Sequence, residues 1–150
     1  MAKPVEEMSS FARFAAPRDL VFFDGACALC HRAVCFLARR DSGGTRFRFA
    51  PLGGPTFLHA IPTGRRAALP DSIAVLTAEG KLLTRSDAVI LALRRLGGVW
   101  GAAATVFAAI PRRLRDASYD MVARKRFSIF GRAQASCPVT PPELRQRFEP

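Results

Sequence analysis

The chain reads Asp24-Gly25-Ala26-Cys27-Ala28-Leu29-Cys30 immediately after the apolar run Leu20-Val21-Phe22-Phe23. The apolar run is typical of a buried β-strand, and Asp24-Gly25 is a turn signal. Cys27 and Cys30 stand three positions apart, which is about one turn of a helix. Two thiols at this spacing either close a local disulfide or share a metal ion.

Downstream of the turn, apolar residues recur at helical spacing, which predicts a helix from about Cys27 to about Arg40. Strand patterns on both sides of Glu79-Gly80 predict an antiparallel hairpin there. The other predicted elements are strands at 45–49, 73–77 and 81–84, a short helix near Phe57, a helix N-capped by Ser86 and stopped at Gly97-Gly98, and helices at 100–109 and 111–127.

This order of elements predicts an α/β protein. A strand, a Cys-x-x-Cys helix, a strand, a hairpin and a helix follow one another as in the thioredoxin-like fold. We therefore expect a mixed four-stranded sheet with flanking helices and a C-terminal helical extension. Residues 1–18 mix charge, serine and proline and are predicted to be a flexible tail, and residues 19–150 a single thioredoxin-like domain.

Several motifs carry a resemblance to one family. Besides Val21 to Cys30 they are Phe36-Leu37, Arg39-Arg40-Asp41, Phe47-Arg48-Phe49-Ala50-Pro51-Leu52, Asp71-Ser72-Ile73, Arg85-Ser86-Asp87-Ala88, Leu96-Gly97-Gly98 and Tyr119 to Gly131. Over residues 20–148 the chain resembles the DCC family of thiol-disulfide oxidoreductases, named after an Asp, a Cys and a Cys that match Asp24, Cys27 and Cys30. The resemblance implies thiol-disulfide exchange as the activity.

Composition narrows the class of protein further. Of the 150 residues 49% are hydrophobic, which favours a folded domain over disorder. No apolar run approaches the ~20 residues of a membrane span, and no secretory signal is recognised, so we expect a cytoplasmic protein. In a reducing compartment a Cys-x-x-Cys pair is more often catalytic or metal-binding than structural.

The net charge of +11 comes almost entirely from arginine and is densest from Arg112 to Arg132. A solvated surface explains this charge most simply, and no nucleic-acid motif accompanies it, so nucleic acid is not expected as a partner. An acidic protein or an anionic membrane surface stays open as an alternative.

Cys27 is predicted to be the nucleophile and Cys30 the resolving thiol. Free backbone amides and the positive end of the helix dipole favour a thiolate at the first cysteine. Asp24 has two interpretations: it accepts the proton of Cys30 as a general base, or it organises the turn by accepting bonds from backbone amides. Both stay open at this point.

Other uses of the cysteines are less favoured. The run from Cys27 to His31 matches the c-type haem attachment motif, but no export signal accompanies it, so no haem or other cofactor is predicted. A structural zinc site needs about four ligands, which the pair lacks unless Cys137 and a histidine join it. Cys35 is predicted to lie in the core, and Cys137 is either a packed thiol or a third redox thiol.

The substrate side of the predicted site departs from the usual thioredoxin-like pattern. Asp71-Ser72 stands where such enzymes carry a cis-proline, so Ser72 is predicted to border the substrate groove and to leave the cysteines open to metal. Arg85, Ser86 and Asp87 begin a helix in the manner of a glutathione site, with ordinary helix capping as the alternative.

These observations lead to two functional hypotheses. The first is a thiol-disulfide oxidoreductase that exchanges its Cys27–Cys30 pair with a protein disulfide or a small thiol such as glutathione, with an electron donor that the sequence does not identify. The alternative is a non-catalytic redox-sensing or metal-binding module that docks an acidic partner through its basic C-terminal helices.

Overall fold

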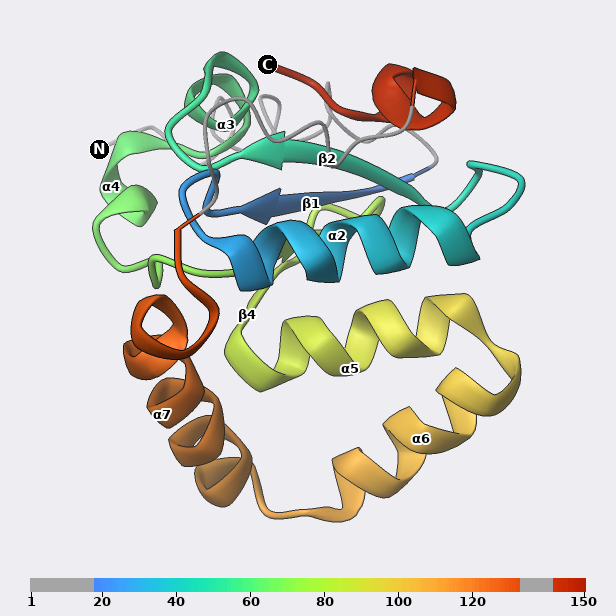
Figure 1. Ribbon diagram of the computed structural model, residues 1–150, viewed down its shortest axis with the longest axis vertical. Coiled ribbons are helices and arrows are strands. Elements are labelled where there is room, and N and C mark those ends of the chain that lie inside the picture. Colours follow the sequence, from blue (N-terminus) through green and yellow to red (C-terminus); the bar gives the residue numbers. More distant parts are fainter. Residues whose placement is uncertain (1–17, 133–141) are drawn as a thin grey trace, which may run out of the picture.

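A computed structural model describes residues 18–132 and 142–150 of the chain. The strands described form one sheet in the order β2-β1-β3-β4, made of β1 (Asp19–Phe23), β2 (Phe47–Pro51), β3 (Ala74–Leu76) and β4 (Leu82–Thr84). β1 runs parallel to β2 and antiparallel to β3, and β3 is antiparallel to β4 (Figure 1).

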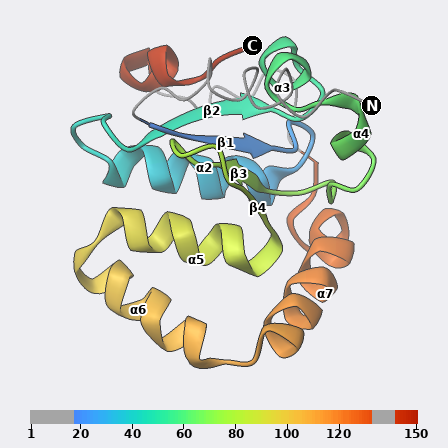
Figure 2. The ribbon, with the colours of Figure 1, turned by 180° about the vertical axis from the view of Figure 1, so that it is seen from behind.

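Helices cover this sheet and extend beyond it. One face carries α2 (Ala28–Arg40) and α5 (Arg85–Leu96), and the chain forms α3 (Pro55–Ala60) and α4 (Thr63–Arg66) on the other side. α6 (Gly98–Ala109) packs against α5, whereas α7 (Arg112–Phe130) contacts both α5 and α2 (Figure 2). The 3-10 helix η1 (Pro142–Arg147) lies against α2 and β2.

β1 is buried along its whole length, which explains the uninterrupted apolar run Leu20–Phe23, and its first residue, the buried Asp19, pairs with Arg95. Val21 and Phe23 point to the core shared with α2 and α5. Leu20 and Phe22 alternate with them and point to the second core, where the Phe22 ring meets the edge of Phe57 with centroids 5.2 Å apart. The sheet thus holds the turn that follows Phe23 between two packed layers.

The predicted thioredoxin-like fold, with its mixed sheet, flanking helices and C-terminal helical extension, is confirmed. The hairpin prediction is also confirmed, with Gly80 in the left-handed region at φ 84°. The prediction that Ser86 caps α5 is wrong, because Thr84 is the N-cap residue and Ser86 lies inside the first turn. The short α4 was not predicted.

The C-terminal segment is anchored to the sheet and to α2. Glu149 donates its backbone amide to the Phe49 carbonyl at 2.7 Å, and the Phe148 ring stacks on Phe49 with centroids 5.0 Å apart. The Arg147 guanidinium donates to the carbonyl oxygens of Ala38 and Asp41. In the described part of the chain, no helix combines the length and the apolar character that crossing a membrane requires. Cys137 lies outside the described residues.

Candidate active site

Cys27 and Cys30 lie where the chain turns from β1 into α2, as predicted. Cys27 is the N-cap residue with extended backbone angles, and its Sγ accepts the backbone amide of Cys30 at 3.2 Å. A bond of this kind satisfies one of the amides that the first helical turn leaves free. Both side chains are buried thiols, Cys27 with no exposed surface at all.

The two thiols differ in their electrostatic surroundings. Burial raises the pKa of Cys30 to about 12, and the hydrogen bond and charge of Cys27 act in the same direction. A backbone bond from Asp24 and the positive charge of Arg126 oppose that rise in pKa. Cys30 is therefore the thiol that keeps its proton, while the Cys27 sulfur is an acceptor of hydrogen bonds.

Asp24 uses both oxygens of its carboxylate. Oδ1 accepts the backbone amide of Ala26 at 2.9 Å, within the turn itself. Oδ2 accepts from Nη2 of Arg126 at 3.1 Å. The first bond is the turn contact that the sequence suggested, and the second joins the turn to α7.

Arg126 is a functional candidate that the sequence analysis missed. It is a buried arginine whose Nη2 also donates to the Asp71 carbonyl at 2.8 Å and whose Nη1 donates to Ala123 O at 2.9 Å. Its guanidinium lies 4.6 Å from the centroid of the Phe127 ring. One side chain thus connects the turn before Cys27, the loop before β3 and α7. Asp24 is 102 positions away in the chain, so no local pattern reveals the pair.

Ser72 lies in the loop before β3, where it was expected. Tyr119 donates its hydroxyl to Ser72 Oγ at 2.6 Å and accepts the Ile73 amide at 3.2 Å. Burial raises the pKa of the Tyr119 phenol, so it remains a hydrogen-bond donor at neutral pH. The described residues contain no cis peptide bond. Ser72 is therefore held by α7, through Tyr119, as Asp71 is held through Arg126.

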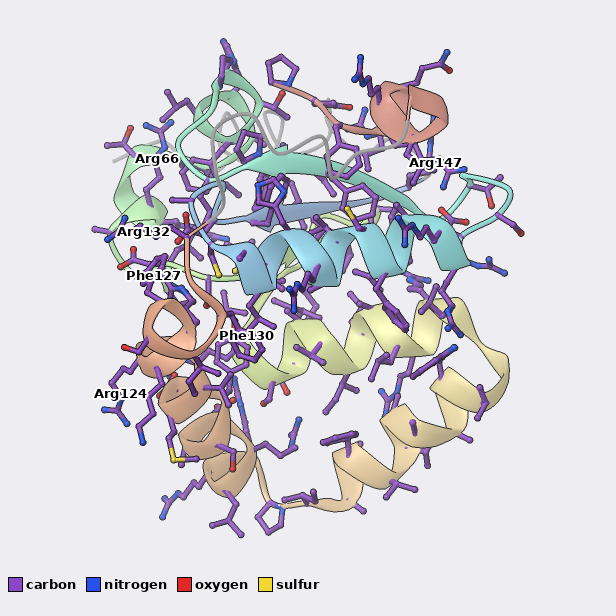
Figure 3. The ribbon with its side chains drawn as sticks, in the orientation of Figure 1. Arg66, Arg124, Phe127, Phe130, Arg132 and Arg147 are labelled. Carbon is purple, nitrogen blue, oxygen red and sulfur yellow. The ribbon has the colours of Figure 1, made fainter. Side chains whose placement is uncertain are left out.

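A two-residue segment at the end of α7, Gly131–Arg132, covers Cys27. Gly131 accepts the Ala28 amide at 3.4 Å, and Arg132 forms an antiparallel bridge with Cys27. Gly131 has a φ of 75°, which favours glycine. The Arg132 guanidinium lies 4.7 Å from the centroid of the Phe127 ring (Figure 3). We call this segment the cover; it lies against the chain beside the predicted nucleophile.

Arg85, Ser86 and Asp87 are brought together with α7. Arg85 pairs with Asp120 at 3.4 Å, and Ser86 donates to Asp116, which lowers the pKa of that carboxyl. Asp87 pairs with two arginines of α7, Arg112 at 3.0 Å and Arg115 at 3.3 Å. These side chains attach α5 to α7, and the glutathione interpretation of them stays a prediction.

The other chemistry-bearing residues are packed rather than gathered into a second site. His31 contacts the Gly25 carbonyl through Nε2 at 3.0 Å, and its ring meets the edge of Phe23. Cys35 lies in the core, as predicted. Among residues 18–132 and 142–150, no three His, Cys, Asp or Glu side chains are grouped so that they could hold a metal ion.

Comparison with known proteins places this geometry in context. Residues 21–132 match the family model of DCC1-like thiol-disulfide oxidoreductases. "Uncharacterized protein YuxK" of Bacillus subtilis (strain 168) is 33% identical over 138 residues, 89% of this chain and 96% of that protein. "DCC family protein At1g52590, chloroplastic" of Arabidopsis thaliana is 28% identical over 131 residues, 87% of this chain and 75% of that protein. No solved structure matches at a significant level.

Proposed function

Since the chain belongs to the DCC1-like thiol-disulfide oxidoreductase family, we propose that it exchanges its own Cys27–Cys30 pair with disulfides of other molecules. The family implies a disulfide-containing substrate, and we propose a protein disulfide or a small disulfide such as that of glutathione. The proposed compartment is the cytoplasm, where a reducing environment keeps such a pair in the dithiol form.

The observation that carries this proposal is the difference in environment between the two thiols of the pair. Cys27 Sγ caps α2 and accepts the Cys30 amide at 3.2 Å, an arrangement that stabilises negative charge on sulfur. Cys30 keeps its proton because burial raises its pKa. This supports Cys27 as the attacking thiolate and Cys30 as the resolving thiol, since disulfide exchange starts from a thiolate.

The proposed reaction consists of two exchanges. Cys27 Sγ⁻ attacks one sulfur of the substrate disulfide, that S–S bond breaks, and the leaving thiolate takes up a proton. Cys30 then attacks Cys27 Sγ, the S–S bond between Cys27 and the substrate breaks, and the proton of Cys30 passes to the departing substrate thiolate as the Cys27–Cys30 disulfide closes. The substrate gains two electrons and the pair loses two. A donor dithiol would restore the pair by the same steps in reverse.

For Asp24, the contacts favour the turn-organising role over that of a general base. Both of its oxygens already accept hydrogen bonds, Oδ1 from the Ala26 amide within the turn and Oδ2 from Arg126 of α7. Asp24→Asn tests this: a lower exchange rate at unchanged stability supports the base, and a loss of stability alone supports the turn.

The substrate-binding roles of Ser72 and of Arg85, Ser86 and Asp87 stay in the proposal. Ser72 is held in the loop before β3, so its contribution is to shape the edge of the groove. Asp87 already pairs with two arginines, which favours helix attachment over capture of glutathione. Calorimetry with glutathione decides: absent binding, or binding unchanged in Asp87→Ala, rejects this glutathione site.

A specific observation favours the second candidate, a non-catalytic redox-sensing module. Cys27 has no exposed surface, and the cover is bridged to its backbone. An enzyme of the proposed kind has to displace the cover in each cycle, whereas a sensor needs only rare access to the pair. The two functions therefore differ in how often the Cys27–Cys30 pair reacts: an enzyme exchanges disulfides repeatedly, whereas a sensor does so rarely.

Reduction of insulin by dithiothreitol, and of bis(2-hydroxyethyl) disulfide, tests turnover. We expect acceleration by the wild type, none by Cys27→Ser, and normal acceleration by Cys35→Ala, the control for losing one buried thiol. Cys30→Ser should accumulate a mixed disulfide on Cys27, detected by mass spectrometry. Equal rates for wild type and Cys27→Ser contradict the enzyme and favour the sensor.

A further inference from the structure

The corner between α6 and α7 exposes large apolar side chains. We define it as Val106–Leu114; it lies at the end of the long axis farthest from the sheet (Figures 1 and 2). Val106 is 70% exposed and Leu114 61%, and Phe107 and Ile110 are exposed as well. α6 itself reads GVWGAAATVFAA, carries no charge, and buries Ala104 alone. Apolar surface gathered in this way marks an interaction site.

The exposed apolar surface continues into a hollow. A cavity of about 290 Å³ between α5, α6 and α7 is lined by Phe107, Ile110 and Leu114 from the corner. Val89 of α5 and Val122 of α7 line it too, and both are exposed. The corner and the mouth of this cavity therefore form one apolar surface rather than scattered single residues.

Within the corner's own stretch of sequence the charged residues are arginines, although Asp87 and Asp116 pair with Arg112 and Asp87 also pairs with Arg115 beside it. Residues 98–115 contain no Asp or Glu, and Arg112, Arg113 and Arg115 fall within that stretch. Arg112 is 69% exposed although it pairs with Asp87. Arg113 is exposed and, within the described residues, is engaged in no ion pair or hydrogen bond. Arg124 is likewise exposed, farther along α7 (Figure 3).

We propose that the α6–α7 corner docks on an anionic lipid bilayer. Val106, Ile110 and Leu114 enter the boundary between headgroups and acyl chains, and Arg113 binds lipid phosphates. A bilayer is the surface that offers an apolar layer directly beneath a layer of negative charge. Nucleic acid supplies the phosphates without an apolar layer, so it would leave the corner in contact with water.

Self-association fits the corner less well. Arg112 and Arg115 are offset by Asp87 and Asp116, but two copies that meet at this corner would bring together their Arg113 side chains, which have no acidic partner among the described residues. An acidic protein would satisfy the charge, and the measurement below separates it from lipid because vesicles contain no protein.

Sedimentation of the full chain with vesicles tests this proposal. Phosphatidylcholine–phosphatidylglycerol vesicles (7:3) should bind it, and pure phosphatidylcholine vesicles should not. Val106→Asn with Leu114→Asn should weaken binding at least tenfold, because two exposed side chains no longer enter the acyl boundary. Leu58→Asn, an exposed residue of α3, is the matched control and should change nothing.

A second pair of variants tests the contribution of positive charge to vesicle binding. Arg113→Gln should weaken binding about fivefold. Arg39→Gln removes an exposed arginine at the end of α2 and should leave binding unchanged. The proposal is overturned if wild type fails to bind the anionic vesicles, or if corner and control variants bind alike. It is also overturned if light scattering shows a dimer that the corner variants dissociate.

Discussion

Arg126 shows how much one side chain can position in this molecule. It holds the Asp24 carboxylate beside the cysteines and the Asp71 carbonyl before β3, and its charge favours ionised sulfur at Cys30. Because it acts through these groups, it is a positioning residue rather than a catalytic one. Lysine keeps the charge but lacks the planar fork that makes several directed bonds.

Arg126→Met should raise the pH at which the Cys30 thiol ionises, measured by thiolate absorbance at 240 nm, and slow exchange. Removing one partner of a largely buried pair should also cost about 2–3 kcal/mol of stability. Arg126→Lys should restore part of the ionisation shift, and Arg124→Met, an exposed arginine on the same helix, is the control. An unchanged pH profile with lowered stability would reduce Arg126 to a structural role.

The raised pKa of Cys30 predicts how stability depends on pH. In the unfolded chain the thiol ionises near its ordinary 9.0, whereas in the folded protein it ionises at about 12. Above pH 9 the folded state holds more protons, so the dithiol form should lose stability up to about pH 12, by about 1.4 kcal/mol per pH unit. Urea unfolding at several pH values measures the slope. Cys30→Ala should flatten it; the same slope in that variant would contradict the assignment.

At the scale of single residues, the sequence correctly predicted that the two cysteines lie between a strand and the start of a helix. It could do so because an apolar strand, a turn and a helix start are local signals. The segment from Tyr119 to Gly131 contributed to the family resemblance, but the sequence did not single out Arg126 or Tyr119, whose partners lie in distant segments. Ser86 was mistaken for a cap because a serine near a helix start looks the same whether it bonds an amide or a distant carboxylate. Its true partner is Asp116, on another helix.

Among the elements, the cover at the end of α7 is the one that pairs with the backbone of Cys27 and Ala28, so we expect access to the cysteines to depend on it. Gly131 adopts a left-handed angle that valine strongly disfavours, while no atom of the described residues lies within 4 Å of the position its Cβ would take. Gly131→Val should therefore strain the closed cover without creating a clash. The strain is about 1–2 kcal/mol, which corresponds to opening about 5–30 times more often.

Alkylation of native protein by iodoacetamide measures this opening. We expect Cys27 to react slowly in the wild type and about 5–30 times faster in Gly131→Val. Gly80→Val in the hairpin is the matched control, since Gly80 also has a left-handed φ and open space around its Cβ position. If both variants react like the wild type, Gly131–Arg132 does not limit access to Cys27.

Across the whole molecule, the last residues belong to the same folded unit as the first strand. Leu144 is buried in the core of α2 and α5, and Phe148 stacks on Phe49 of β2. This supports the proposed single domain over residues 19–150, although residues 133–141 are not described. The sequence analysis assigned no element to this C-terminal segment, because anchoring by a few side chains leaves no periodic pattern.

Phe148→Ala tests whether the C-terminal segment and the sheet unfold as one domain. We expect the free energy of unfolding to fall by about 2–3 kcal/mol in urea, with a single cooperative transition, because a half-buried aromatic ring is lost. Gln146→Ala, an exposed position on η1, should stay within about 0.5 kcal/mol of the wild type. Equal stability of the two variants would mean that the C-terminal segment folds independently of the sheet.

If Gly131–Arg132 limits access to Cys27, its bridge to Cys27 also determines which oxidants react with the protein. A thiol reached only while the cover is open reacts at a rate with a ceiling: beyond some concentration, more peroxide or more small disulfide brings no faster oxidation. A substrate whose own backbone competes with Gly131–Arg132 for Ala28 is not bound by that ceiling, because it helps to open the site. Selectivity would then depend on how fast a substrate displaces Gly131–Arg132. A substrate that fits the site would react faster than a small oxidant present at higher concentration.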